Sequence, residues 1–198
     1  EAWKRVGAES LVLYPDTLKV EKRKDLYVDL SAIAKGFGVD KVAQALEEMG
    51  VRRYMVEVGG EIRVGDPKSS QRPWRLAVEK PVPQLREVQL VIEASDLALA
   101  TSGDYRNYFE QDGRRYSHTI DPRTGQPIQH KLVSATVIAA TCADADAWAT
   151  AMMVLGPEQG LVVADAQNLA VYMLVKTDSG LEARHSRAFA MYLPPALK

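Results

Sequence analysis

The sequence is poor in cysteine and contains no long apolar run. Cys142 is the single cysteine among 198 residues, so the chain forms no internal disulfide and no cysteine-rich zinc or iron–sulfur centre. The apolar runs are short and interrupted by charge, and none approaches the roughly 20 apolar residues that a membrane span requires. The chain also lacks a fixed-period repeat, a GxGxxG fingerprint and a P-loop. These absences exclude a disulfide scaffold, a repeat array and the commonest nucleotide-binding motifs.

Charge of neither sign dominates. Lys and Arg number 25 against 26 Asp and Glu, which gives a formal net charge of -1. No global positive field draws this protein to nucleic acid or to anionic lipid. An anionic ligand must therefore be met by a local site. Hydrophobic residues make up 46% of the chain, enough for a sizeable core at this length.

We expect one α+β domain with a mostly antiparallel sheet and packed helices, because strands and helices do not alternate regularly along the chain. The i, i+3, i+4, i+7 spacing predicts a helix over Val39–Met49 that ends at Gly50, and further helices are predicted over Ala143–Leu155 and Glu158–Ala166. Clusters of β-branched and aromatic residues between turn signals predict strands over Tyr27–Leu30, Arg53–Val58, Trp74–Val78, Val88–Ile92, Val133–Ala139 and Ala170–Val175.

The run Asp29–Asp40 (DLSAIAKGFGVD) leads from an expected strand into the first helix. Small residues let a ligand approach the backbone there, and the free N–H groups at a helix N-terminus attract anions. Lys35 then either binds a phosphate or pairs with Asp29. A plain strand-to-helix corner, with Gly36 or Gly38 present for tight packing, explains the same residues.

Three further segments are predicted as turns or loops. Gly59-Gly60, within Val58–Glu61 (VGGE), suits a hairpin turn or a close approach of backbone to a ligand. Thr101–Tyr105 (TSGDY) and His118–Pro127 (HTIDPRTGQP) supply hydroxyls, a carboxylate and a histidine that can grip a phosphate and move a proton. The alternative is an ordinary Asx-type turn with a structural histidine.

The run Ala145–Thr150 (ADAWAT) lies in the expected second helix. Asp146 and Thr150 are four residues apart, so their oxygens share one helix face and are within reach of one ion. A carboxylate and a hydroxyl are hard-oxygen ligands that suit Mg²⁺. The alternative is that Asp144 or Asp146 caps the helix, while the Thr150 hydroxyl bonds back to the carbonyl of Asp146.

In this order, these five runs resemble the FAD:protein FMN transferases, the ApbE family, and the resemblance covers nearly the whole chain. It implies an ApbE-like, T-fold-related architecture. It also implies a Mg²⁺-dependent enzyme that cleaves the pyrophosphate of FAD, attaches FMN by a phosphoester bond to a Thr or Ser of a client protein, and releases AMP. A FAD pyrophosphatase that yields FMN and AMP, and a flavin-binding scaffold with little turnover, are the alternatives.

The resemblance also implies roles for individual residues. Those expected to bind FAD are Asp29, Lys35, Thr101, Ser102, Gly103 and His118. Those expected to hold the metal are Ala32, through its main-chain carbonyl, and Asp146 and Thr150, through their side chains. His118 is expected to activate the acceptor hydroxyl, and Asp104 is the alternative base.

The chain departs from the family pattern in two ways. Ala149 stands where many relatives carry a second Asp just before the metal-binding Thr. The single domain 1–198 is also expected to lack the family's N-terminal segment, which carries part of the adenine and isoalloxazine pocket. The resemblance further implies clients among the subunits of membrane redox complexes. It implies a location in the periplasm or on the outer face of the bacterial inner membrane, often as a lipoprotein.

Overall fold

A computed structural model describes residues 2–70, 72–81, 87–103, 108–111 and 114–195. Its body is a six-stranded sheet with the order β14-β13-β12-β7-β4-β3, and every pairing in this sheet is antiparallel. The strands are β3 (Met55–Val58), β4 (Glu61–Val64), β7 (Leu97–Gly103), β12 (Leu132–Ala139), β13 (Ala170–Thr177) and β14 (Gly180–His185). The expectation of an α+β fold with a mostly antiparallel sheet is confirmed.

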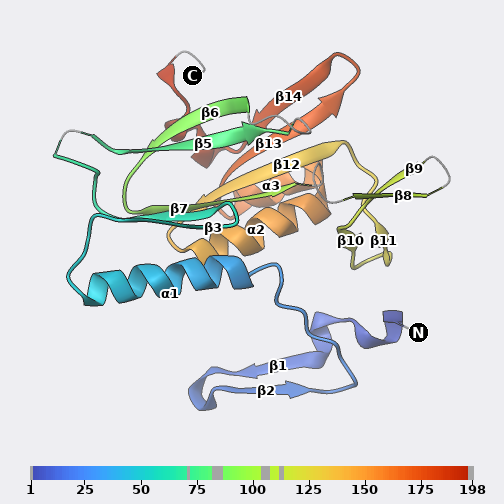
Figure 1. The fold of residues 1–198 in the computed structure, drawn as a ribbon. Coiled ribbons are helices and arrows are strands. Elements are labelled where there is room, and N and C mark those ends of the chain that lie inside the picture. Colours follow the sequence, from blue (N-terminus) through green and yellow to red (C-terminus); the bar gives the residue numbers. More distant parts are fainter. Residues whose placement is uncertain (1, 71, 82–86, 104–107, 112–113, 196–198) are drawn as a thin grey trace.

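Both faces of this sheet are covered. Three helices pack on one face, and a two-stranded ribbon and a 3-10 helix pack on the other (Figure 1). The helices are α1 (Ala34–Glu48), α2 (Cys142–Leu155) and α3 (Pro157–Ala166); the ribbon is β5 (Trp74–Lys80) with β6 (Glu87–Ala94), and the 3-10 helix is Arg187–Tyr192. Along β13, Tyr172 packs beneath the ribbon while its neighbour Met173 packs against α2 and α3. This alternation explains why the strand is a continuous apolar run in the sequence.

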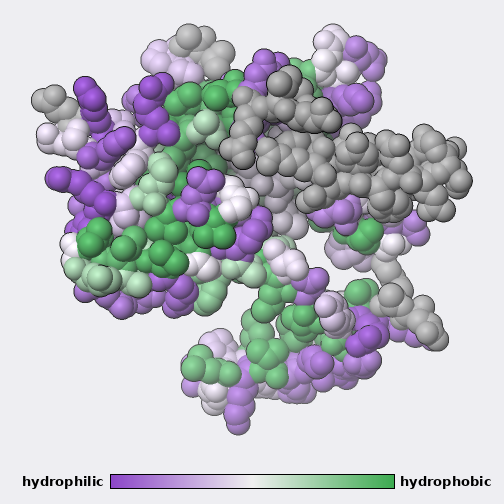
Figure 2. Space-filling model, in the orientation of Figure 1, coloured by the Kyte–Doolittle hydropathy of each residue, from purple (hydrophilic) through white to green (hydrophobic). Residues whose placement is uncertain are grey.

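An N-terminal arm lies apart from this body (Figure 1). It contains the hairpin of β1 (Leu11–Tyr14) and β2 (Lys19–Lys22), on which Leu13, Leu18 and Val20 are exposed. Figure 2 shows apolar surface on this lobe. In the described part of the chain, no helix is both long enough and apolar enough to cross a membrane.

The predicted strand over Tyr27–Leu30 is wrong, since this stretch is irregular and leads from the arm to α1. Tyr27, Val28 and Leu30 are exposed there and lie against no sheet, so their β propensity finds no neighbouring strand.

The other predicted elements are confirmed with shifted ends. The first helix begins at Ala34 and not at Val39, and the strand predicted from Arg53 begins at Met55. The hairpin turn considered at Gly59-Gly60 is confirmed, since it joins β3 to β4. The loop expected from Thr101 is wrong up to Gly103, because these residues end strand β7. Strands β7, β14 and both strands of the arm were missed, as were the short hairpins of β8 (Tyr108–Gln111) with β9 (Arg114–Ser117) and β10 (Ile120–Asp121) with β11 (Gln126–Pro127). Strand β7 was missed because its sequence, LALATSG, lacks β-branched and aromatic side chains at most positions.

Helices α1 and α2 touch at their N-terminal ends through Gly36. A Cβ added to Gly36 would overlap the backbone carbonyl of Cys142, the first residue of α2. A Cβ added to Gly38 would have nothing within 4 Å. The bare backbone of Gly36 therefore sets how closely the two helices approach.

We expect Gly36→Ala to destabilise the protein by about 2 kcal/mol or more, because backbone atoms must shift to admit the methyl group. Gly38→Ala is the matched control, and it should stabilise the protein by roughly 0.5–1 kcal/mol through helix propensity alone. Urea unfolding of both variants measures the difference. Equal effects at the two positions would show that the helices do not meet at Gly36.

Candidate functional site

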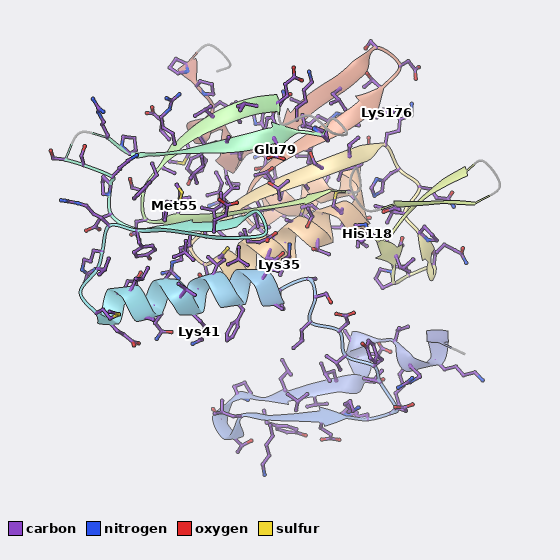
Figure 3. The ribbon with its side chains drawn as sticks, viewed as in Figure 1. Lys35, Lys41, Met55, Glu79, His118 and Lys176 are labelled. Carbon is purple, nitrogen blue, oxygen red and sulfur yellow. The ribbon has the colours of Figure 1, made fainter. Side chains whose placement is uncertain are left out.

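One cavity of about 570 Å³ collects residues from segments that are far apart in the sequence. Figure 3 labels three of its lining residues, which are Lys35 on α1, Glu79 on β5 and His118 between β9 and β10. Its polar and glycine lining comprises Ser31, Lys35, Glu57, Gly59, Gly60, Glu79, Thr101, Ser102, Gly103, His118, Thr119, Asp146 and Thr150. Strand β7 and helix α2 also contribute apolar side chains to the lining, namely Leu99 and Met153.

Most of the predicted site residues meet in this cavity. Lys35, Thr101, Ser102, Gly103, His118, Asp146 and Thr150 all line it. Asp29 and Ala32 are not among the lining residues, although Ser31, which lies between them, is. Asp104 lies outside the described residues.

Asp29 shapes the loop that precedes α1. Its Oδ1 accepts the main-chain N–H of Ser31 at 2.7 Å and also accepts the Ser31 hydroxyl. These hydrogen bonds lower the pKa of the exposed Asp29 carboxyl below its ordinary value. Asp29 thus holds Ser31, whose side chain reaches the cavity wall.

The carboxylate of Asp146 joins the two helices and also faces the cavity. The residue is only 2% exposed, and its Oδ2 accepts the N–H of Gly36 at 3.0 Å. Its Oδ1 accepts no hydrogen bond from the part of the chain that the structure describes. One carboxylate oxygen is therefore committed to α1, and the other remains for a ligand.

The structure excludes the helix-cap alternative for this segment. The hydroxyl of Thr141 caps α2 by accepting the N–H of Asp144 at 3.1 Å. The Thr150 hydroxyl lies 3.1 Å from the hydroxyl of Ser102 on β7, and this is the hydrogen bond it makes in place of one to its own helix. Neither Asp146 nor Thr150 therefore caps α2, the helix to which both belong.

Sequence reasoning assigned no role to Glu61, which follows Gly59-Gly60 at the start of β4. It is 1% exposed, and its Oε1 accepts a hydrogen bond from Nζ of Lys35 at 2.6 Å. Its Oε2 is buried and has no hydrogen-bond partner among the described residues. Burial raises the pKa of Glu61, and the Lys35 ammonium opposes this shift. Lys35 therefore pairs with Glu61 and not with Asp29, the partner considered from the sequence.

The donor set suits a hard cation that is accompanied by an anionic group. Asp146 and Thr150 offer a carboxylate and a hydroxyl in one cavity, beside the ammonium of Lys35. Within the described residues no group of three or more His, Cys, Asp or Glu side chains is placed to hold a metal. A cation held here would take its other ligands from main-chain carbonyls, water or phosphate oxygens, as Mg²⁺ usually does.

Lys35→Met should destabilise the protein in a pH-dependent way. Without the ammonium, the pKa of buried Glu61 rises further, while the unfolded chain releases that proton at its ordinary pKa of about 4.3. The variant therefore loses stability relative to wild type as the pH rises above that value. We expect a loss of about 1–3 kcal/mol at pH 8 and a smaller one at pH 4, measured by urea unfolding.

Lys41→Met is the matched control for this experiment. Lys41 lies in the same helix and is exposed; its ammonium donates to Gln44 and lies over the ring of Phe37, and it pairs with no buried carboxylate among the described residues. Its replacement should produce no such pH dependence. Equal losses from Lys35→Met at both pH values would contradict the pairing of Lys35 with Glu61.

Comparisons with known sequences agree with one another. The model of the ApbE family matches residues 1–173. A Vibrio cholerae protein named FAD:protein FMN transferase is 52% identical over 94% of this chain and 56% of its own length. A Haemophilus influenzae protein of the same name is 47% identical over 96% of this chain and 55% of its own length. The chain thus spans about half the length of these curated relatives.

Solved structures show the same likeness. The flavin transferase ApbE of Vibrio cholerae matches with a TM-score of 0.84 at 47% identity, over 96% of this chain and 60% of that one. The apo flavinyl transferase ApbE of Pseudomonas stutzeri matches with a TM-score of 0.84 at 40% identity, over 96% of this chain and 58% of that one. The expected ApbE-like architecture is confirmed, and the chain belongs to the ApbE family.

Proposed function

We propose that this chain carries the metal and phosphate site of a FAD:protein FMN transferase. The observation that carries the proposal is the convergence of Lys35, Asp146, Thr150 and His118 on one cavity. In the proposed reaction a hydroxyl of a Thr or Ser in a client protein attacks the FMN-side phosphorus of FAD. The pyrophosphate bond breaks, AMP leaves, and FMN stays on the client through a phosphoester bond.

In this proposal, groups that donate hydrogen bonds bind the diphosphate of FAD. The Lys35 ammonium gives one hydrogen to Glu61 and has two others to offer to a phosphate. The hydroxyls of Thr101 and Ser102 and the backbone at Gly103 line the same wall. Groups fixed in this way hold the phosphates in line for attack and stabilise the charge that develops on the leaving oxygen.

Asp146 and Thr150 would hold a Mg²⁺ ion through their side chains, with the main-chain carbonyl of Ala32 as a further ligand. When bound, the ion supplies positive charge to the oxygens of the diphosphate. Two observations support this assignment. The first is that Oδ1 of Asp146 has no hydrogen bond among the described residues. The second is that Oδ2 of Asp146 accepts the Gly36 N–H, so in the described part of the chain this N–H is not bonded to the carbonyl of Ala32, four residues earlier.

His118 is the base that this proposal assigns to the acceptor hydroxyl. It is exposed at the cavity wall, where an incoming client side chain has access. Imidazole carries one ring nitrogen that can accept a proton when the ring is neutral, so it can take the proton of the acceptor hydroxyl. Asp104, the alternative base, lies outside the described residues.

Two further parts of the proposal rest on family resemblance alone. They are that the clients are subunits of membrane redox complexes, and that the protein works in the periplasm or on the outer face of the bacterial inner membrane. Lipid attachment belongs to the same part of the proposal.

Asp146→Asn should abolish Mg²⁺-dependent turnover, with a loss of roughly 100-fold or more, because an amide oxygen is a weaker ligand than a carboxylate. The assay combines the protein with FAD, Mg²⁺ and a client domain that bears an acceptor Thr. It measures AMP by chromatography and flavin fluorescence on the client. Asp144→Asn, two residues away in the same helix and exposed, makes the same change of charge and should retain activity.

The products of this assay separate the three candidate activities. AMP together with a fluorescent client supports transfer. AMP with free FMN and no need for a client indicates a FAD pyrophosphatase, and binding of FAD without AMP release indicates a flavin-binding scaffold. Normal Mg²⁺-dependent turnover by Asp146→Asn would refute the metal assignment.

His118→Ala should slow transfer by roughly 100-fold while leaving the affinity for FAD nearly unchanged, as expected for loss of a general base. The transfer rate is measured at saturating FAD, and FAD affinity is measured separately by fluorescence quenching. Equal losses in the rate and in FAD affinity would make His118 a binding residue and not the base.

A further inference from the structure

Helices α1 and α2 satisfy each other's unpaired backbone amides. The first N–H groups of any α-helix have no partner inside the helix. In α2, the N–H groups of Cys142 and Ala143 donate to the two oxygens of Asp40 at 2.9 and 2.8 Å. In α1, the N–H of Gly36 donates to Asp146 at 3.0 Å.

The two helices use the same spacing for this exchange. Gly36 and Asp40 are four residues apart in α1, and Cys142 and Asp146 are four apart in α2, so each pair lies on one helix face. Each helix thus offers main-chain N–H groups and one carboxylate to the other helix, and these groups hydrogen-bond across the contact. A carboxylate at a helix N-terminus is also favoured by the helix dipole. We refer to these four residues together with Ala143 as the helix joint.

Asp40 is in turn anchored to the sheet. Nη1 of Arg63, on β4, lies 2.8 Å from Oδ1 of Asp40, and both side chains are largely buried. Arg63 also contacts Glu47 near the C-terminal end of α1, with Nη2 at 3.4 Å from Oε1. The Asp40 carboxylate therefore holds three donors, from α2 and from β4, in a fixed arrangement.

We propose that Asp40 is a positioning residue for Asp146, which it holds in the orientation that binds the metal. Asp40 is not among the residues that line the cavity. It fixes the start of α2 against α1, and this places the Gly36 N–H where it donates to one oxygen of Asp146 and leaves the other oxygen for the ion. The inference rests on the proposed function in that it takes Asp146 to be a metal ligand.

Asp40→Asn tests this role, and Thr141→Ala is its matched control. An Asn side chain has one acceptor oxygen in place of two, so it cannot serve the N–H groups of Cys142 and Ala143 together with Arg63. Thr141→Ala removes the hydroxyl that accepts the N–H of Asp144 at the same end of α2. It leaves the helix joint intact. Both variants lose a helix cap, which typically costs about 1 kcal/mol.

Two measurements distinguish positioning from simple capping. The first is hydrogen exchange of the Gly36 amide in the metal-free protein, measured by NMR. The exchange should be faster in Asp40→Asn than in wild type and unchanged in Thr141→Ala. The second is the affinity for Mg²⁺ alone, measured by isothermal titration. It should fall roughly tenfold or more in Asp40→Asn, as for other residues that orient a metal ligand, and should not change in Thr141→Ala.

Each outcome decides the matter. Equal changes in the two variants would overturn the positioning role and leave Asp40 as a cap. If wild type bound no Mg²⁺, or if binding survived Asp146→Asn, the proposed metal site would be wrong. The hydrogen exchange rate of the Gly36 amide would still show whether Asp40 maintains the hydrogen bond between Gly36 and Asp146. If Asp40→Asn does not fold, Arg63→Met takes its place. This variant keeps the carboxylate but removes its ion pair, and it should shift both readouts in the same direction.

Discussion

The N–H groups at the start of an α-helix need acceptors from outside the helix, and in this protein two helices provide them to each other. Asp40 of α1 accepts from Cys142 and Ala143, and Asp146 of α2 accepts from Gly36. The absence of a side chain on Gly36 lets the backbones meet. Because the two helices belong to segments about a hundred residues apart, this joint determines where the cavity's carboxylate stands relative to Lys35.

The buried negative charge of Glu61, beside the cavity, is paired locally. Glu61 is fully buried, and an isolated buried carboxylate would be costly, so Lys35 stays beside it. Asp146 adds a second carboxylate that raises the pKa of Glu61 further. Glu57 and Glu79 also line the cavity, so carboxylates outnumber the Lys35 ammonium there, and a bound cation would offset part of this negative charge. An anionic substrate would be held by this cation, by Lys35 and by main-chain amides, with no need for a basic surface.

Much of the fold could be predicted because the core elements carry strong local signals. The three helices and strands such as Ala170–Thr177 are apolar enough to be recognised from periodicity or composition alone. The strand predicted over Tyr27–Leu30 failed because β propensity does not supply a partner strand. Strand β7 was missed because its small residues have a low β propensity. They form a strand because β12 and β4 pair with them on the two sides.

The site was predictable as a set of residue types but not as an arrangement. That Asp146 and Thr150 share one helix face follows from their spacing, whereas their role as metal ligands came from the family resemblance, and the five family runs indicated which segments meet. Glu61 was missed because a glutamate after Gly-Gly in a hairpin is typical of an exposed turn, and only its position on a buried strand reveals the pairing with Lys35. The partner of Asp40 lies about a hundred residues away, and no local pattern indicates such a contact.

The central claim is that the joint between α1 and α2 creates a divalent cation site at Asp146 and Thr150. Anomalous diffraction from crystals soaked in Mn²⁺, which shares the oxygen-ligand preference of Mg²⁺, tests it most directly. The account predicts an anomalous peak in the cavity, at about 2.0–2.3 Å from a carboxylate oxygen of Asp146 and from the hydroxyl of Thr150. A cavity without a peak, or an ion bound only to Glu57 and Glu79, which also line the cavity, would contradict it.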